Sequence, residues 1–205
     1  MIVLSDAEAI VLCQNGDIKG LEPLAVRYQA PAFRLAYLLS GNHTLADDIV
    51  QDSFLQAYRT IEQFQPHQPF APWFYRIVTN LTRQYYRRDL QRQTISLGSI
   101  EELRGDESTQ NPITHAESTE VRDALFLALA EVNNLQRETI ILRYYLGYRD
   151  QEIAMIVGCS PGTARQRLHT GLQKLEKIIR QKYNWLINEH SHHVIFTTPE
   201  EIYHA

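Results

Sequence analysis

Polar and basic residues within Leu135–Lys182 have the spacing of a helix-turn-helix, the motif that places a helix in the major groove of DNA. Asp150 is expected to cap a first short helix, and Gly158 stands where that helix must end. Ser160 then caps a second helix that has Pro161 as its first residue. The residues expected to contact DNA on this second helix are Ser160, Thr163, Arg165, Gln166, Arg167, His169 and Lys174.

The local charge favours DNA binding over the alternative of an ordinary helix pair with a solvated polar face. Arg137–Lys182 holds nine Lys or Arg against four Asp or Glu, although the 205-residue chain has a net charge of −4. Trp73–Arg92 has five Arg and one Asp, whereas Ser99–Asp123 has seven acidic residues and two Arg. Basic charge therefore occurs in two blocks separated by an acidic strip.

A cluster of acidic residues precedes the first basic block. Asp48 and Asp52 share one face of an expected helix, and Gln51 adjoins them. Paired carboxylates at this spacing could hold a divalent cation, but the sequence offers no second acidic helix to complete the ligand set. We therefore expect no metal site and favour an acidic face that docks a basic partner, with Phe54 and Tyr58 as apolar anchors.

Aromatic residues and arginines are interleaved over Pro69–Arg88, a mixture that suits single-stranded nucleic acid. Rings stack on unpaired bases at about 1–3 kcal/mol for each base, while arginines neutralise the backbone. The alternative is that the aromatic residues form the core of an amphipathic helix, which explains Trp73 better than base stacking does. Nucleic-acid contact better explains Arg83, Tyr86, Arg87 and Arg88.

Helical spacing runs through nearly the whole chain and predicts an all-α fold of two small helical domains joined by an acidic linker. The expected helices are Ser5–Gln14, Leu21–Leu39, Thr44–Ile61 with Thr44 and Asp47 as its capping pair, Ala71–Gln91, and helical pattern from Ala116 to Lys182. The expected organisation is a first domain over 1–92, the linker over 93–115, the helix-turn-helix domain over 116–182, and a histidine-containing extension over 183–205.

The compartment is expected to be the cytoplasm. No apolar run reaches membrane-spanning length, and the N-terminus lacks the pattern of a signal peptide. Cys13 and Cys159 lie far apart in the sequence, and we expect reduced thiols rather than a disulfide.

The order of these segments resembles the extracytoplasmic-function (ECF) group of bacterial RNA polymerase sigma factors, the compact members of the sigma-70 family. The resemblance covers about Leu21–Lys182 and is carried by Asp47–Tyr58, Phe70–Asn80 and Arg137–Leu168 in that order. Two departures are notable. Family members usually carry Leu-Pro where this chain has Val132–Leu135, and Arg-Ala-Arg where it has Thr170–Leu172. The second departure removes two positive charges, so weaker or altered −35 recognition is expected.

The resemblance implies a factor that binds core RNA polymerase and directs initiation at particular promoters, recognising the −35 element as duplex and melting the −10 element. It assigns polymerase binding to Asp47, Asp48, Gln51, Asp52, Phe54 and Tyr58. It assigns −10 DNA binding to Trp73, Arg76, Asn80, Arg83, Tyr86, Arg87 and Arg88. It assigns −35 binding to the helix-turn-helix residues given above. No catalytic residue and no cofactor are implied, because the polymerase performs the chemistry.

Other functions remain open at this point. One is a helix-turn-helix regulator that acts without polymerase and senses a ligand through a helical domain. Another is a metal-dependent enzyme built on Asp48, Asp52 and His43, against which the missing second acidic cluster counts. The extension could bind metal through His190, His192 and His193, or dock on the body or a partner through its apolar run 194–196. An anti-sigma factor is a further partner that the resemblance leaves open.

Overall fold

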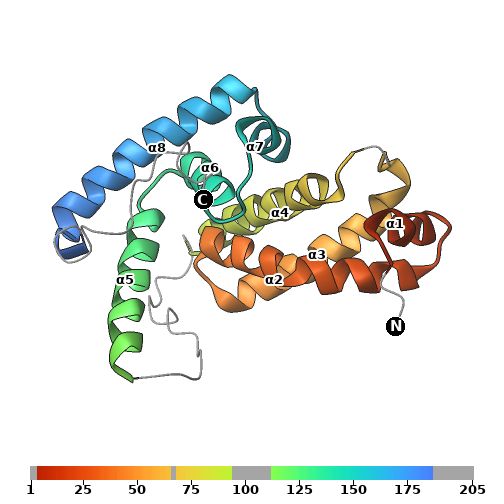
Figure 1. Cartoon of the computed structure of the whole chain (residues 1–205), viewed down its shortest axis with the longest axis horizontal. Coiled ribbons are helices and arrows are strands. Elements are labelled where there is room, and N and C mark those ends of the chain that lie inside the picture. The colour runs from red at the N-terminus through yellow and green to blue at the C-terminus, as the bar shows by residue number, and fades with distance from the viewer. Residues whose placement is uncertain (1–3, 66–67, 94–111, 187–205) are drawn as a thin grey trace.

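The computed structural model describes residues 4–65, 68–93 and 112–186, with the side chains of 89–93 and 112–119 left out of the description. Over these residues the chain is built from helices and two short 3-10 turns, Ile18–Gly20 and Ile61–Gln63, and contains no strand (Figure 1). The helices are α1 (Asp6–Gln14), α2 (Leu21–Ser40), α3 (His43–Thr60), α4 (Phe70–Gln93), α5 (Pro112–Ala130), α6 (Asn134–Tyr144), α7 (Asp150–Val157) and α8 (Pro161–Lys182). The prediction of an all-α fold is confirmed. We call α1–α4 the first half and α5–α8 the second half.

Local capping chemistry sets the ends of the first helices. Ser5 caps α1, and its backbone N–H donates to the Glu8 carboxylate at 2.8 Å. The expected start of α3 at Thr44 is wrong, because Asn42 is the cap and accepts a hydrogen bond from the Leu45 N–H at 2.8 Å. Gly41 ends α2 with a φ of 75°, which leaves Asn42 in an extended conformation with its side chain over the new helix.

The turn of the helix-turn-helix forms largely as its sequence predicts. Gly158 ends α7 in the left-handed conformation, with a φ of 71°. Ser160 caps α8 and accepts from the Thr163 N–H at 3.1 Å, and Pro161 is the first helical residue. The expected cap of α7 is wrong by one position, because Arg149 occupies the cap and Asp150 is already helical.

The second half differs from the expected boundaries at two further points. α5 begins at Pro112, which lies inside the segment expected to be linker, while linker residues 94–111 lie outside the described part of the chain. Asn133 caps α6 and accepts from the Leu135 N–H at 2.9 Å. An asparagine cap therefore starts this helix within Val132–Leu135.

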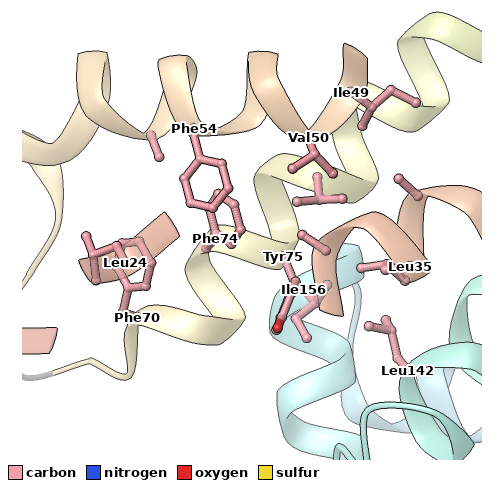
Figure 2. Packing of buried hydrophobic residues seen from close by; sticks show 14 of the residues in the cluster. Leu24, Leu35, Ile49, Val50, Phe54, Phe70, Phe74, Tyr75, Leu142 and Ile156 are labelled. Atoms are coloured by element: carbon pink, nitrogen blue, oxygen red, sulfur yellow. The ribbon is translucent and has the colours of Figure 1, made fainter. Parts of the chain in front are cut away.

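Aromatic packing forms the centre of the first half, where α2, α3 and α4 meet. The Phe74 ring is fully buried and lies with its centroid 4.5 Å from that of Phe54 and 5.7 Å from that of Phe70 (Figure 2). Tyr28 from α2 completes the cluster at 5.2 Å from Phe70. Burying an aromatic side chain of this size contributes several kcal/mol, so this cluster holds the three helices together.

A glycine in the middle of α8 allows this helix to pack closely against α6. A Cβ on Gly171 would stand 3.0 Å from the Gln136 Cβ and 3.1 Å from the Ile140 Cδ1, both on α6. Gly171 is therefore required by the close approach of α6 and α8, which offsets the roughly 1 kcal/mol that glycine costs within a helix. This packing explains why glycine stands at 171, the middle residue of Thr170–Leu172, where the sequence departs from the usual family pattern.

The two halves are not separate in this structure. α4 packs against α7, and α2 packs against α6. A single buried apolar cluster includes Leu35 and Val78 of the first half together with Leu142 and Ile156 of the second. Figure 2 shows Leu142 beside Leu35 and Ile156 beside Tyr75. The two helical domains expected from the sequence therefore share a core.

Candidate functional site

The acidic face of α3 lies on the surface. Asp47, Asp48, Gln51 and Asp52 are all exposed, while Ile49 on the opposite side of the helix is fully buried. Asp52 is not a free carboxylate, because it accepts a hydrogen bond from the Tyr85 O–H on α4 at 2.6 Å. This hydrogen bond, together with partial burial, raises the pKa of Tyr85. The predicted polymerase-binding helix is thereby tied to the predicted −10-binding helix.

The two aromatic anchors expected beside these acids are engaged within the fold. Phe54 is buried against Phe74, and Tyr58 is half-buried and donates from its O–H to the Gly16 carbonyl at 3.1 Å. The exposed apolar residue on this helix is Leu55, at 49% exposure. Sequence reasoning missed Leu55, although its spacing of three and seven residues from Asp52 and Asp48 puts it on their face.

Residues expected to contact −10 DNA fall on different sides of α4. Arg76, Asn80, Arg87 and Arg88 are exposed. Arg83 faces the second half, where its Nε and Nη2 donate to the Glu138 carboxylate at 2.7 Å and 2.5 Å. The hydrogen bonds to Glu138 raise the pKa of the Arg83 guanidinium, so it remains charged inside this interface.

The aromatic residues of α4 are mostly part of the core. Trp73 is half-buried, with its ring centroid 5.1 Å from that of Phe64 and 5.5 Å from that of Phe70. This is the core role that the residue pattern favours for Trp73. Tyr86 is half-buried. The Arg88 guanidinium lies over the Tyr85 ring, 5.9 Å from the ring centroid, within the range of a cation–π contact.

The first turns of α8 present a polar surface. Thr163, Gln166 and His169 are exposed, as are Arg165 and Lys174, whereas Arg167 is half-buried. The Arg165 Nε donates to the Asp150 carboxylate of α7 at 2.9 Å, which links the two helices of the motif. Ser160 is used locally, because its Oγ both accepts from the Thr163 N–H and hydrogen-bonds the Thr163 hydroxyl at 2.8 Å.

The described residues provide no cluster of three or more His, Cys, Asp or Glu side chains suited to a metal ion. The His43 Nδ1 lies 3.8 Å from a carboxylate oxygen of Asp47. Within the same ranges, no helix combines the length and apolar character needed to span a bilayer. Cys13 and Cys159 are both free thiols. The histidines at 190, 192 and 193 and the apolar run 194–196 lie outside the described residues.

Comparison with known proteins assigns a family to each half. Residues 24–92 match the sigma-70 region 2 model, and residues 122–175 match the sigma-70 region 4 model. The ECF RNA polymerase sigma-E factor of Escherichia coli K12 is 30% identical over 185 residues, covering 86% of this chain and 95% of that protein. The ECF RNA polymerase sigma factor EcfG of Rhodopseudomonas palustris is 33% identical over 150 residues, covering 73% and 80%.

Solved structures share the fold at lower identity. CnrH, in complex with the cytosolic domain of CnrY, aligns with a TM-score of 0.64 and 22% identity over 86% of this chain and 98% of that one. The sigma factor RpoE of Bartonella quintana, in complex with the anti-sigma factor NepR, gives 0.65 and 22% over 80% and 99%. With two matching region models in the family's order and relatives of 30% identity along most of the chain, the protein belongs to the ECF sigma factors of the sigma-70 family, which direct promoter-specific transcription initiation.

Proposed function

We propose that three surfaces of this chain divide the work of initiation in the cytoplasm. The acidic face of α3 binds core RNA polymerase, the exposed side of α4 binds the melted −10 element, and the first turns of α8 read the −35 element. The observation that carries the proposal is the capped start of α8, where Thr163, Gln166 and His169 are exposed.

The −35 assignment depends on the spacing of these side chains. Residues three apart follow one another along one face of a helix, so Thr163, Gln166 and His169 can meet successive base edges. A glutamine can donate to and accept from adenine, and each good base contact contributes about 1–3 kcal/mol of discrimination. The Arg165–Asp150 ion pair holds α8 to α7, and Lys174 lies further along the helix, where it can reach a phosphate.

The −10 assignment depends on exposed polar groups of α4. Asn80 can hydrogen-bond a base edge, and Arg87 and Arg88 can neutralise phosphates. Melting requires a base to leave the stack, which costs a few kcal/mol that contacts with the displaced strand must offset. The exposed cations of α4 supply part of that compensation.

The polymerase assignment depends on charge and one apolar side chain. Asp47, Asp48 and Gln51 are exposed, and Leu55 offers apolar area on the same face. Complementary charge speeds association and fixes orientation, while a desolvated apolar anchor supplies affinity. Asp48 and Leu55 are therefore the residues whose change should most affect binding to core polymerase.

Run-off transcription with purified core polymerase and a promoter library tests the assignments of α3 and α8. Asp48→Lys should abolish promoter-specific transcripts by preventing binding to core, whereas Glu22→Lys, an exposed acid on α2, should leave them unchanged. Gln166→Ala should weaken transcription by roughly 5- to 150-fold and relax −35 preference, since about 1–3 kcal/mol is at stake. Gln173→Ala, exposed on the same helix, is its control.

The outcomes separate the proposal from its rival. Promoter-specific transcripts from the wild type that disappear with Asp48→Lys support the polymerase-binding face. Unchanged transcription with both Asp48→Lys and Gln166→Ala would refute these two residue assignments. Duplex binding without any transcript, even with core in excess, would instead favour a stand-alone helix-turn-helix regulator.

We also propose an anti-sigma factor as a partner. CnrH and the Bartonella RpoE were each solved in complex with a second protein, and NepR is an anti-sigma factor. A partner of this class, added before core polymerase, should suppress the run-off reaction.

A further inference from the structure

An ion pair joins the two helices of the helix-turn-helix at the surface. The Nε of Arg165 on α8 donates to the Oδ2 of Asp150, the first residue of α7, at 2.9 Å. The Asp150 side chain is 21% exposed, whereas the Arg165 side chain is 76% exposed. The carboxylate is therefore held against the body of the protein, and the guanidinium that it binds stands in solvent.

Apolar packing already joins these two helices, so folding does not require the ion pair. Ile153 and Ala154 of α7 are buried in the same cluster as Ala164 of α8. An ion pair with so exposed an arginine adds little to stability, because water screens the charges and ordering the long side chain costs entropy. A role in recognition explains the pair better than a role in folding does.

The hydrogen bond to Asp150 uses only one of the three nitrogens of the Arg165 guanidinium. Within the part of the chain that the structure describes, Nη1 and Nη2 have no hydrogen-bond partner. These two groups lie at the end of a planar fork, and they can donate together to O6 and N7 of one guanine in the major groove. The bond at Nε restricts the orientation of the fork and leaves its outer edge available.

The other candidate positions on this side of α8 are less available. Arg167 is half-buried, whereas Arg165 is exposed. Thr170 stands where the family usually carries arginine, and its hydroxyl accepts from the Gln136 Nε2 at 2.9 Å and donates to the Gln166 carbonyl at 2.8 Å. Thr170 is therefore engaged with α6, and the exposed guanidinium in the first turns of α8 is that of Arg165.

The charge of the pair favours contact with a base over contact with the DNA backbone. An unpaired arginine is attracted to any phosphate, which raises affinity for every sequence alike. Asp150 cancels this charge within 2.9 Å, so the pair as a whole adds little general attraction. Hydrogen bonds from Nη1 and Nη2 to a guanine remain possible, and they depend on sequence.

We propose that Asp150 is a positioning residue for −35 recognition, which holds the Arg165 guanidinium so that Nη1 and Nη2 read one guanine of the −35 element. The proposal rests on the assignment of α8 to this element. Preorganisation by Asp150 lowers the entropy that Arg165 loses on binding, and the carboxylate opposes its capture by a phosphate. Asp150 thus raises specificity without raising general affinity.

The test uses the full-length chain bound to core polymerase and promoter duplexes in which each −35 base pair is replaced in turn. Preference at a position is the ratio of the dissociation constants for the replaced and the original duplex. Arg165→Lys keeps the positive charge but lacks the planar fork, so guanine preference at one position should fall by roughly fivefold or more. Unchanged preference with Arg165→Lys would show that Arg165 contacts only phosphate, which would overturn the proposal.

Asp150→Ala should lower guanine preference at that same position by about 2- to 12-fold, the usual cost of immobilising a long side chain on binding. Affinity for duplexes that lack this guanine should stay equal or rise, because a carboxylate that repels phosphates is gone. Partial unfolding would lower both quantities, so the opposite directions identify a positioning role. The matched control is Glu176→Ala, which breaks the 2.8 Å pair with Arg180 further along α8 and should change neither quantity.

Gln166→Ala separates this proposal from the assignment on which it rests. Altered preference with Gln166→Ala, together with unchanged guanine preference in Asp150→Ala, would overturn the role of Asp150 and leave the −35 assignment of α8 intact. Equal loss of affinity for all duplexes in Asp150→Ala would overturn it as well. Unchanged preference with Gln166→Ala, Arg165→Lys and Asp150→Ala would refute both the assignment and the proposal.

Discussion

Substitution of Gly158 gives a quantitative test of how the helix-turn-helix is built. The residue has a φ of 71° and a ψ of 51°, and an added Cβ would meet no atom closer than the Arg76 Nη2 at 3.9 Å. The cost of Gly158→Ala therefore comes from backbone conformation and not from a clash. A left-handed conformation costs an L-residue about 1–2 kcal/mol, so we expect Gly158→Ala to lower the free energy of unfolding by that amount.

Gly162 is the matched control because it lies in the first turn of α8 with a helical backbone. Its added Cβ would approach only the Ser160 Oγ, at 3.9 Å. Alanine is preferred to glycine in a helix by about 0.5–1 kcal/mol, so Gly162→Ala should stabilise the chain. The two Gly-to-Ala changes, four residues apart, are expected to have opposite signs. Gly158→Asn should recover part of the loss, because asparagine tolerates the left-handed region better than alanine.

Urea unfolding followed by circular dichroism measures the three variants against the wild type. The difference between the two alanine variants should be about 2 kcal/mol, which corresponds to roughly 4–8 °C in Tm for a chain of this size. A Gly158→Ala variant as stable as the wild type, or an asparagine variant no better than alanine, would refute the conformational argument.

Three further predictions concern the first half and its interface. Phe74→Ala should lower the free energy of unfolding by about 3–5 kcal/mol in urea titrations, because the ring is fully buried, and a loss below 1 kcal/mol would contradict its central place. Gln14→Ala should cost about 1–2 kcal/mol in the same assay, since its Nε2 donates to the Ile61 and Phe64 carbonyls at 3.0 Å and 3.1 Å, and Gln14→Glu should not rescue it. Burial raises the pKa of Tyr75 and of Tyr148, so both hydroxyls stay protonated in the folded chain while the unfolded chain ionises near pH 10. Stability should therefore be complete below that pH and fall above it by up to about 1.4 kcal/mol per pH unit for each tyrosine, less in the Tyr148→Phe variant, as unfolding at pH 9 and pH 11 would show.

Local signals account for the features that could be predicted from sequence. Gly158, Ser160 and Pro161 specify their turn within four residues, so both the glycine conformation and the cap of α8 follow from the sequence. The cap of α3 was predicted wrongly because Asn42 and Thr44 are both good caps, and the choice depends on how Gly41 ends the previous helix. Neighbouring candidates of equal quality cannot be ranked without the tertiary fold.

Contacts between distant residues account for most of what the sequence did not reveal. Arg83 and Glu138 are 55 residues apart, and nothing near either residue in the sequence indicates the other. Phe54 was expected at the surface because it adjoins acidic residues, yet it points between α3 and α4, and Leu55 takes the exposed position. Phe54 is buried because it packs against Phe74, and the position of Phe74 depends on how α3 and α4 pack together.

The division of α8 into two faces has a consequence for how promoter choice can change over generations. Ala164, Leu168 and Leu175 hold the helix in the core, whereas Thr163 and Gln166 are exposed. Substitutions at exposed helical positions usually alter stability by less than about 0.5 kcal/mol. Under the −35 assignment proposed above, new combinations at these two positions can therefore arise without threatening folding, and a duplicated gene can acquire a different set of target promoters while its product keeps the same scaffold.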